Sequence, residues 1–144
     1  MTDSMKIPQP PKPAPQLRYA VLQHDGVLPP HFDLMFETDP RSLLSTWRSQ
    51  TWPILSSTPL LKVADHRREF LTFEGPLTGN RGSVTRVISG YYRLERPTPG
   101  LWQMTFRDYL GFVKLEFRKE DVPPKATPSG AMQSPEEPWT ARPT

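Results

Sequence analysis

The sequence predicts an all-β fold, a small closed or nearly closed barrel of about eight strands. Short runs of β-branched and aromatic residues recur along the chain, and each run ends in a turn signal such as Asp25-Gly26 or Asp39-Pro40. No long segment keeps a 3.6-residue apolar period, so we expect little helix. Many short strands separated by turns are typical of a sandwich or a barrel.

The first half of the chain carries several of these segments. Residues 18–23 and 31–38 are predicted strands that stop at the two turn pairs. Residues 42–48 fit either a strand or a short helix, because their large apolar residues also form a helical stripe. Residues 60–65 form a short apolar run and are predicted as a strand.

The second half continues the pattern. Residues 69–73 are predicted as a strand, and a glycine-rich loop follows over residues 75–82. Residues 83–95 are the longest predicted strand. Residues 102–107 and 112–118 form the last predicted hairpin, with a glycine in their turn.

Proline usage divides the chain into one domain and two tails. The chain has 144 residues, 19 prolines and no cysteine. Prolines are frequent in residues 1–16 and 122–144, and both segments are predicted to be disordered because they bury too little apolar surface to offset their ordering entropy. Residues 17–121 then form a single domain. The lack of cysteine excludes disulfides, a thiolate metal site and a cysteine nucleophile.

Charge and hydropathy narrow the class of protein further. The formal net charge of +3 favours an anionic partner only slightly, and is not by itself a nucleic-acid-binding composition. The first residues contain no apolar leader segment, and no stretch approaches the ~20 apolar residues of a membrane-spanning helix. We therefore expect a cytoplasmic protein without a membrane partner, and a monomer.

The histidines are the main functional signal. His24 and His31 lie close together in the sequence, and His66 is the third and last histidine. In a strand, His31 and Asp33 share one face, while Phe32 points to the other face. Imidazole and carboxylate groups bind Zn²⁺, Mn²⁺ or Fe²⁺. Inward positions of a barrel converge, so we expect a metal or phosphate site in its interior; the alternative is that backbone carbonyls satisfy the histidines.

Several short motifs follow one another along the core. They are His24, His31-Phe32-Asp33, Trp52-Pro53, Asp65-His66, Phe73-Glu74-Gly75 and Gly79-Asn80-Arg81-Gly82-Ser83-Val84. In this order they resemble the 3′-phosphoesterase domain of bacterial DNA ligase D, which also occurs as a stand-alone protein. The resemblance covers about residues 18–118, which is nearly the whole predicted domain.

The resemblance implies a fold, a metal and a reaction. It implies an eight-stranded β-barrel with a Mn²⁺ site that removes a 3′-terminal ribonucleotide or a 3′-phosphate from DNA ends during end repair; Zn²⁺ or another divalent metal would suit the same ligands. The metal ligands would be His24, His31 and Asp33, and His66 would be the catalytic residue at the scissile phosphate. The implied partners are DNA 3′ ends, including RNA-tipped primer-templates, and an end-joining ligase or polymerase.

Three positions depart from the family pattern. Met35 and Thr58 stand where the family has arginines, and Phe70 stands where it has a tyrosine. Loss of a charge-assisted contact to a transferring phosphoryl group can lower the rate by roughly 10²–10³. Metal binding is therefore better supported by the sequence than catalysis.

Other charged residues near the motifs are candidates for supporting roles. Arg67 and Arg81 are candidate substrate-binding residues that would compensate for the missing arginines. Glu74 would either orient a ligand histidine or cap the turn at Gly75.

Two other functions are consistent with the residues. One is a metal-binding barrel with weakened catalysis that binds DNA ends or a repair partner. The other is an Fe(II) oxygenase, in which His31, Asp33 and His66 would form a facial triad.

Overall fold

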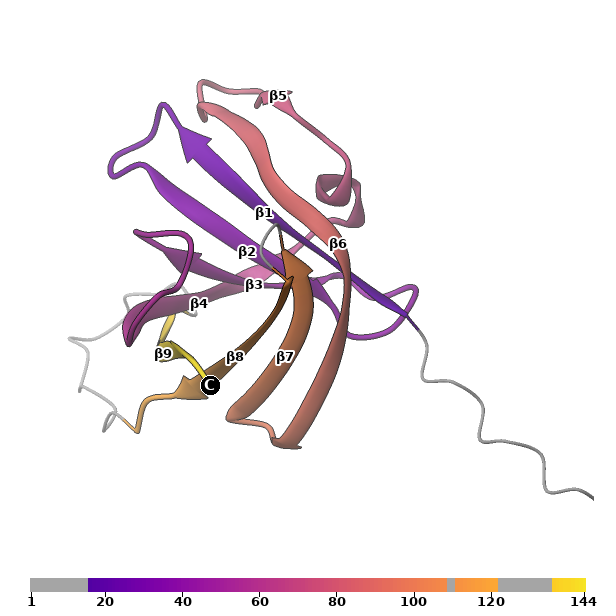
Figure 1. Cartoon of the computed structure of the whole chain (residues 1–144). Helices are drawn as coiled ribbons and strands as arrows, with labels where there is room; N and C mark the ends of the chain where they lie inside the picture. The colour runs from indigo at the N-terminus through magenta and orange to yellow at the C-terminus, as the bar shows by residue number, and fades with distance from the viewer. Residues whose placement is uncertain (1–15, 109–110, 122–135) are drawn as a thin grey trace, which may run out of the picture.

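The computed structural model describes residues 16–108, 111–121 and 136–144. The strands form one closed, eight-stranded antiparallel barrel, so the predicted fold class is confirmed (Figure 1). Around the barrel the strands follow the order β1 (Leu17–Asp25), β2 (His31–Glu37), β3 (Leu44–Ser49), β4 (Thr58–His66), β9 (Glu137–Pro143), β8 (Gly111–Lys119), β7 (Leu101–Asp108) and β6 (Ser83–Thr98). Strand β6 pairs with β1 and closes the barrel.

A short excursion between β4 and β6 lies outside the barrel wall. It contains the 3-10 helix η2 (Arg68–Leu71) and the two-residue strand β5 (Gly75–Pro76), which pairs only with β6 (Figure 1). The described residues contain no α-helix. Among the described residues, no helix has the length and the apolar composition needed to span a membrane.

The structure decides one local prediction that was open and contradicts another. Residues 42–48, which fit a helix or a strand, contribute β3. The strand predicted for residues 69–73 is wrong, because that segment contains most of η2. The Arg68 guanidinium forms an ion pair with the buried Glu37 carboxylate and donates to the Ser42 carbonyl at 2.7 Å. These contacts hold the segment across the outside of the wall instead of along a neighbouring strand.

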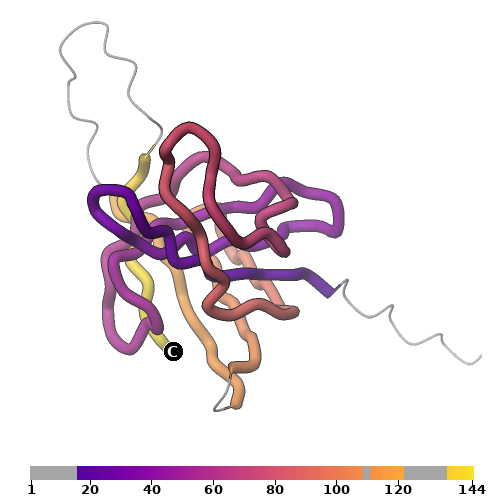
Figure 2. Tube along the Cα trace, turned by 90° about the horizontal axis from the view of Figure 1, so that it is seen from above, coloured from indigo at the N-terminus to yellow at the C-terminus, as the bar shows by residue number. Residues whose placement is uncertain are grey.

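The C-terminal segment needs a larger correction. A disordered tail was predicted for residues 122–144, but β9 pairs with both β4 and β8 and completes the barrel (Figure 1, Figure 2). Trp139 and Ala141 alternate inward and are buried, whereas Arg142 is exposed. Flanking prolines concealed this period-2 pattern in the sequence. The domain therefore continues beyond residue 121. Of the tails predicted for residues 1–16 and 122–144, residues 1–15 and 122–135 lie outside the described residues.

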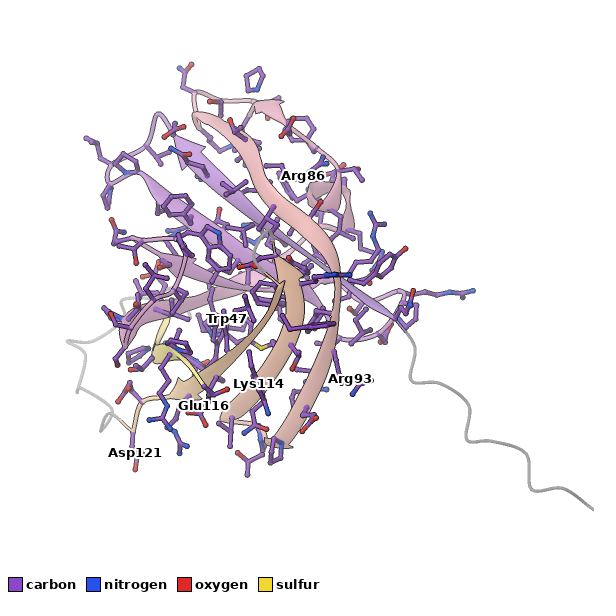
Figure 3. The ribbon with its side chains drawn as sticks, viewed as in Figure 1. Trp47, Arg86, Arg93, Lys114, Glu116 and Asp121 are labelled. Carbon is purple, nitrogen blue, oxygen red and sulfur yellow. The ribbon has the colours of Figure 1, made fainter. Side chains whose placement is uncertain are left out.

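Aromatic side chains fill the barrel interior. Trp47 lies at its centre (Figure 3) and makes edge-to-face contacts with Trp102, Phe117 and Trp139, with ring centroids 4.7, 5.0 and 5.3 Å away. Leu34 and its β2 neighbour Phe36 belong to this interior cluster. Because the side chains of a strand alternate, His31 and Asp33 face the opposite side of the same wall.

A second, smaller apolar cluster covers the outer side of the wall. Ala20, Leu22 and Met35 of the first hairpin pack there against Leu71 of η2. The predicted interior position of the histidine site is therefore wrong. The interior is occupied by aromatic rings, and the histidine face lies outside the wall, beside the excursion formed by residues 67–82.

Candidate metal centre

The hairpin of β1 and β2 brings His24, His31 and Asp33 together. His24 at the end of β1 is the direct cross-strand partner of His31 at the start of β2, and their ring centroids are 4.9 Å apart. Asp33 follows two residues later on the same face, opposite Leu22. One nitrogen or oxygen atom from each of the three residues lies within 4.8 Å of the others.

Backbone carbonyls orient all three histidine rings. His24 Nε2 lies 2.7 Å from the Arg81 carbonyl oxygen, His31 Nδ1 3.0 Å from that of Pro29, and His66 Nδ1 3.0 Å from that of Ala64. A carbonyl oxygen only accepts, so each of these ring nitrogens is the one that carries hydrogen. The other nitrogen of each ring then presents its lone pair, which is the arrangement of metal-binding histidines.

The three free ring nitrogens converge on the Asp33 carboxylate. Their distances to its nearest oxygen are 3.7 Å for His24 Nδ1, 3.5 Å for His31 Nε2 and 3.9 Å for His66 Nε2. All three distances exceed those of ordinary hydrogen bonds. Among the described residues, His24 Nδ1, His31 Nε2 and Asp33 Oδ1 are buried and have no hydrogen-bond partner.

This spacing is suited to a divalent cation. Donor atoms that bind one tetrahedral metal ion at roughly 2.0–2.2 Å lie about 3.4 Å from one another. A buried polar atom without a partner costs about 1–3 kcal/mol, and a bound cation would satisfy all three atoms at once. Two imidazoles and one carboxylate could therefore hold a metal here without a change of strand register. The geometry groups His24, rather than His66, with His31 and Asp33.

His66 ends β4 and lies beside this cluster. Its side chain is partly exposed, and its ring contacts Phe70 edge to face at a centroid distance of 5.7 Å. Among the described residues, the grouped ligand atoms exclude His66. Its lone-pair nitrogen is thus available to a ligand in the neighbouring cavity.

Arg48 is a site residue that sequence reasoning missed. It is the cross-strand partner of Asp33, and its Nε lies 3.6 Å from Asp33 Oδ1. The sequence could have indicated Arg48 only through its position in residues 42–48. That position places Arg48 beside Asp33 only when the segment is assigned as a strand paired with β2. Met35, by contrast, is fully buried in the outer apolar cluster. Thr58 starts β4, at the opposite end of that strand from His66.

Neighbouring groups keep Asp33 ionised. Burial raises the pKa of the carboxyl, but without a metal the protonated forms of the His31 and His66 rings, together with Arg48, outweigh that effect and hold its pKa below the ordinary value. Asp33 is therefore a carboxylate at neutral pH, as a metal ligand must be.

A cavity of about 270 Å³ opens beside the cluster. Its charged and imidazole side chains come from β1 to β4 and from the excursion: His24, Asp33, Arg48, Asp65, His66, Arg67 and Arg81. Three arginines face two carboxylates there, so the cavity favours an anionic ligand. Phe70 supplies part of its apolar wall.

The two arginines predicted from the sequence both line this cavity but differ in freedom. Arg67 has a mostly exposed side chain, with a 3.6 Å ion pair to Glu69. Arg81 donates from Nε to the Thr78 carbonyl at 2.7 Å and from Nη2 to the Thr78 hydroxyl at 2.9 Å. Arg81 also provides the carbonyl that orients His24.

The sequence predicts that Glu74 orients a ligand histidine or caps the turn at Gly75, but in the structure Glu74 has a different partner. Its carboxylate accepts the backbone N–H of Arg86 at 2.7 Å, and the Arg86 side chain donates to the Thr72 carbonyl at 2.6 Å. The β1–β6 register shifts next to Arg86, between Val21 and Leu22. Glu74 thus fastens the excursion to β6, and backbone carbonyls take the histidine-orienting role proposed for it.

Gly82 allows the glycine-rich loop to reach the site. Its φ is +80°, and a Cβ there would overlap the Asp25 carbonyl oxygen. This close approach places the neighbouring Arg81 carbonyl against His24.

No protein-family model matches the chain, and no curated protein matches it. The likeness to the 3′-phosphoesterase domain of DNA ligase D therefore stays a prediction from its motifs.

Proposed function

We propose that this protein is a divalent-metal-dependent phosphoesterase that acts on the 3′ ends of DNA. The observation that carries the proposal is the convergence of three unpartnered ligand atoms, from His24, His31 and Asp33, beside a cavity lined by three arginines. A two-histidine, one-carboxylate set suits Mn²⁺ and also Zn²⁺.

A bound metal would polarise a phosphoryl oxygen and lower the pKa of a coordinated water. Arg48 supplies a guanidinium at the same point, since its Nε lies 3.6 Å from Asp33 Oδ1 and its side chain is about one-third exposed, at 32%. Guanidinium N–H groups match the nonbridging oxygens of a phosphate. The Arg48 guanidinium would support catalysis although Met35 stands where the family has an arginine. It therefore favours an active phosphoesterase over a barrel with weakened catalysis.

His66 is suited to the leaving group. Its Nδ1 is committed to the Ala64 carbonyl, so Nε2 is the nitrogen that can exchange a proton in the cavity. Hydrolysis of a 3′-phosphate breaks the bond between phosphorus and the 3′ oxygen, and that oxygen must gain a proton. We assign this transfer to His66, whose free Nε2 would take up the proton that the attacking water loses and pass it to the 3′ oxygen.

The biological setting belongs to the same proposal. The substrate would be a DNA 3′ end carrying a terminal ribonucleotide or a phosphate, and the product would be a 3′-hydroxyl for a ligase or polymerase partner. We propose a monomer that acts in the cytoplasm.

A primer-template cleavage assay tests the proposal. One substrate carries a 3′-terminal ribonucleotide and another a 3′-phosphate, and each is incubated with and without Mn²⁺. We expect conversion to a 3′-hydroxyl end that requires Mn²⁺ and is lost in His31→Ala. Metal binding and end binding without any conversion would contradict a phosphoesterase and support the binding-only alternative. Succinate release from 2-oxoglutarate with Fe²⁺ would support the oxygenase instead.

A further inference from the structure

The cavity beside His24, His31 and Asp33 is called the metal cavity below. A second cavity, of about 360 Å³, adjoins it on the side of the excursion. Four residues line both cavities, namely Arg67, Phe70, Leu77 and Arg81. Phe73 lines only the second one. A ligand held by its phosphate in the first cavity would therefore extend directly into the second.

Two phenylalanines form the apolar wall of this second cavity. The Phe70 and Phe73 rings meet edge to face at 86°, with centroids 5.9 Å apart. Phe70 also contacts His66, so the aromatic wall is continuous with the metal cavity. In the described part of the chain, Phe70 is the only ring that Phe73 contacts. Phe73 is 37% exposed and is available for contact with a ligand.

The backbone holds Phe73 in place although its ring is exposed. Its N–H donates to the Glu69 carbonyl at 3.0 Å, which closes the turn after η2. The next residue, Glu74, is fastened to the Arg86 N–H of β6. Because the backbone on both sides of Phe73 is already fixed, only the side-chain freedom of Phe73 is lost when a flat ligand stacks on its ring.

The shared arginines supply charge at the border between the two cavities. Arg81 uses Nε and Nη2 to bind Thr78, which leaves other guanidinium N–H groups for a ligand. Arg67 is almost free, because its side chain is 83% exposed and its 3.6 Å ion pair with Glu69 is weak. The two guanidinium groups thus lie between the cavity that would hold a phosphate and the phenylalanine wall. This arrangement suits a nucleotide, which carries both a phosphate and a flat base.

We propose that the second cavity is a nucleobase subsite, in which the base of the terminal nucleotide stacks on Phe73. The inference rests on the proposed function, because the phosphate of that nucleotide lies in the metal cavity. Every base has a π face, so stacking accepts purines and pyrimidines alike. The substrate class is then a nucleotide end of any sequence, and sugar phosphates and phosphopeptides are poor ligands. An apolar peptide side chain would also fit the phenylalanine wall, but it would leave the metal cavity without its anion.

Calorimetric binding in the presence of Mn²⁺ tests the subsite, with all proteins carrying His66→Gln so that the nucleotide probes are not hydrolysed during the titration. The probes are deoxyadenosine 3′-monophosphate, thymidine 3′-monophosphate and inorganic phosphate. Stacking on an aromatic side chain improves binding by about 5- to 150-fold, so both nucleotides are expected to bind tighter than phosphate by a factor in this range. Phe73→Leu should remove most of this gain without changing the affinity for inorganic phosphate.

Two further variants make the result specific. Phe73→Tyr keeps an aromatic face and should keep the gain. Phe112→Leu removes a phenylalanine that is even more exposed, at 80%, and lines neither cavity, and it should behave like the parent. Equal affinity for nucleotides and phosphate, or an unchanged gain in Phe73→Leu, would overturn the subsite alone. Failure of the Mn²⁺-loaded protein to bind any of the three probes would overturn the proposed function together with it.

Discussion

At the scale of single residues, the candidate site depends on which side chains reach Asp33. His24 and His31 do so from the same hairpin, and their short sequence separation made the grouping predictable. Arg48 does so from the neighbouring strand, which the sequence left open between helix and strand. Met35 has the right parity but lies in an apolar cluster. Residue type and parity therefore predict which candidate ligands cluster, whereas the source of positive charge becomes clear only from the strand pairing.

The Arg48 guanidinium should matter for turnover more than for metal binding. In Arg48→Ala we expect the rate of 3′-end cleavage to fall by about 10²–10³, the usual cost of a lost contact to transferring charge. Mn²⁺ affinity should persist, since the three ligands remain. Arg93→Ala, at an exposed arginine remote from the cavity, is the matched control. Equal rates for the two variants would rule out this role of Arg48.

Gly82 gives a second prediction at the residue scale. A Cβ at this position would overlap the Asp25 carbonyl, so Gly82→Ala must move the loop that carries Arg81 away from His24. Loss of a carbonyl that orients a metal-binding histidine typically lowers metal affinity by about 10- to 100-fold. Gly90→Ala is the control, because its Cβ would make an ordinary 3.5 Å contact with the Tyr19 ring. A Gly82→Ala protein that binds Mn²⁺ like the parent would contradict the orienting role.

At the scale of elements, local pairings were predictable and distant ones were not. The β1–β2 hairpin follows from alternation and a turn pair that lie close together in the sequence. Strand β9 pairs with β4 and β8 across long separations, and prolines at positions 138 and 143 hide its alternation. Helix η2 depends on the Arg68–Glu37 ion pair between separate elements. Such contacts leave no periodic trace in the local sequence.

The β8–β9 pairing predicts a pH dependence of stability. The Arg142 side chain donates to the Glu116 carboxylate at 2.6 Å and, with Arg118, holds the pKa of that carboxyl below its ordinary value. A lowered pKa in the folded state stabilises the protein above the unfolded-state pKa, and this contribution is lost as pH falls through the lowered one. Because Arg142 is more than half exposed, solvent screening keeps the effect modest.

Glu116→Gln should therefore lose less stability than the parent when urea unfolding is repeated between about pH 7 and pH 3. Glu95→Gln, at an exposed glutamate on β6, should follow the parent. Identical acid sensitivity in all three proteins would show that the Glu116–Arg142 contact does not link β8 to β9 in solution.

At the scale of the whole molecule, the barrel separates stability from function. Its interior is packed with rings such as Trp47 and Trp102, which stabilise the fold. The outer face of the β1–β3 wall carries the polar cluster, and the excursion of residues 67–82 builds the other side of the cavity. The fold class was predictable because turns and alternation recur along the chain. The location of the site was not, because alternation defines two faces without stating which one is enclosed.

A Mn²⁺ titration followed by calorimetry tests the proposal that His24, His31 and Asp33 bind a divalent metal. We predict saturable binding of one Mn²⁺ per chain in the parent protein, and loss of that binding in both His31→Ala and Asp33→Asn. Parallel thermal unfolding should show stabilisation of the parent by Mn²⁺, by about 2.7 kcal/mol at a hundredfold excess over Kd, and none of the variants. Absence of saturable binding in the parent, or equal binding in a folded Asp33→Asn variant, would contradict the claim.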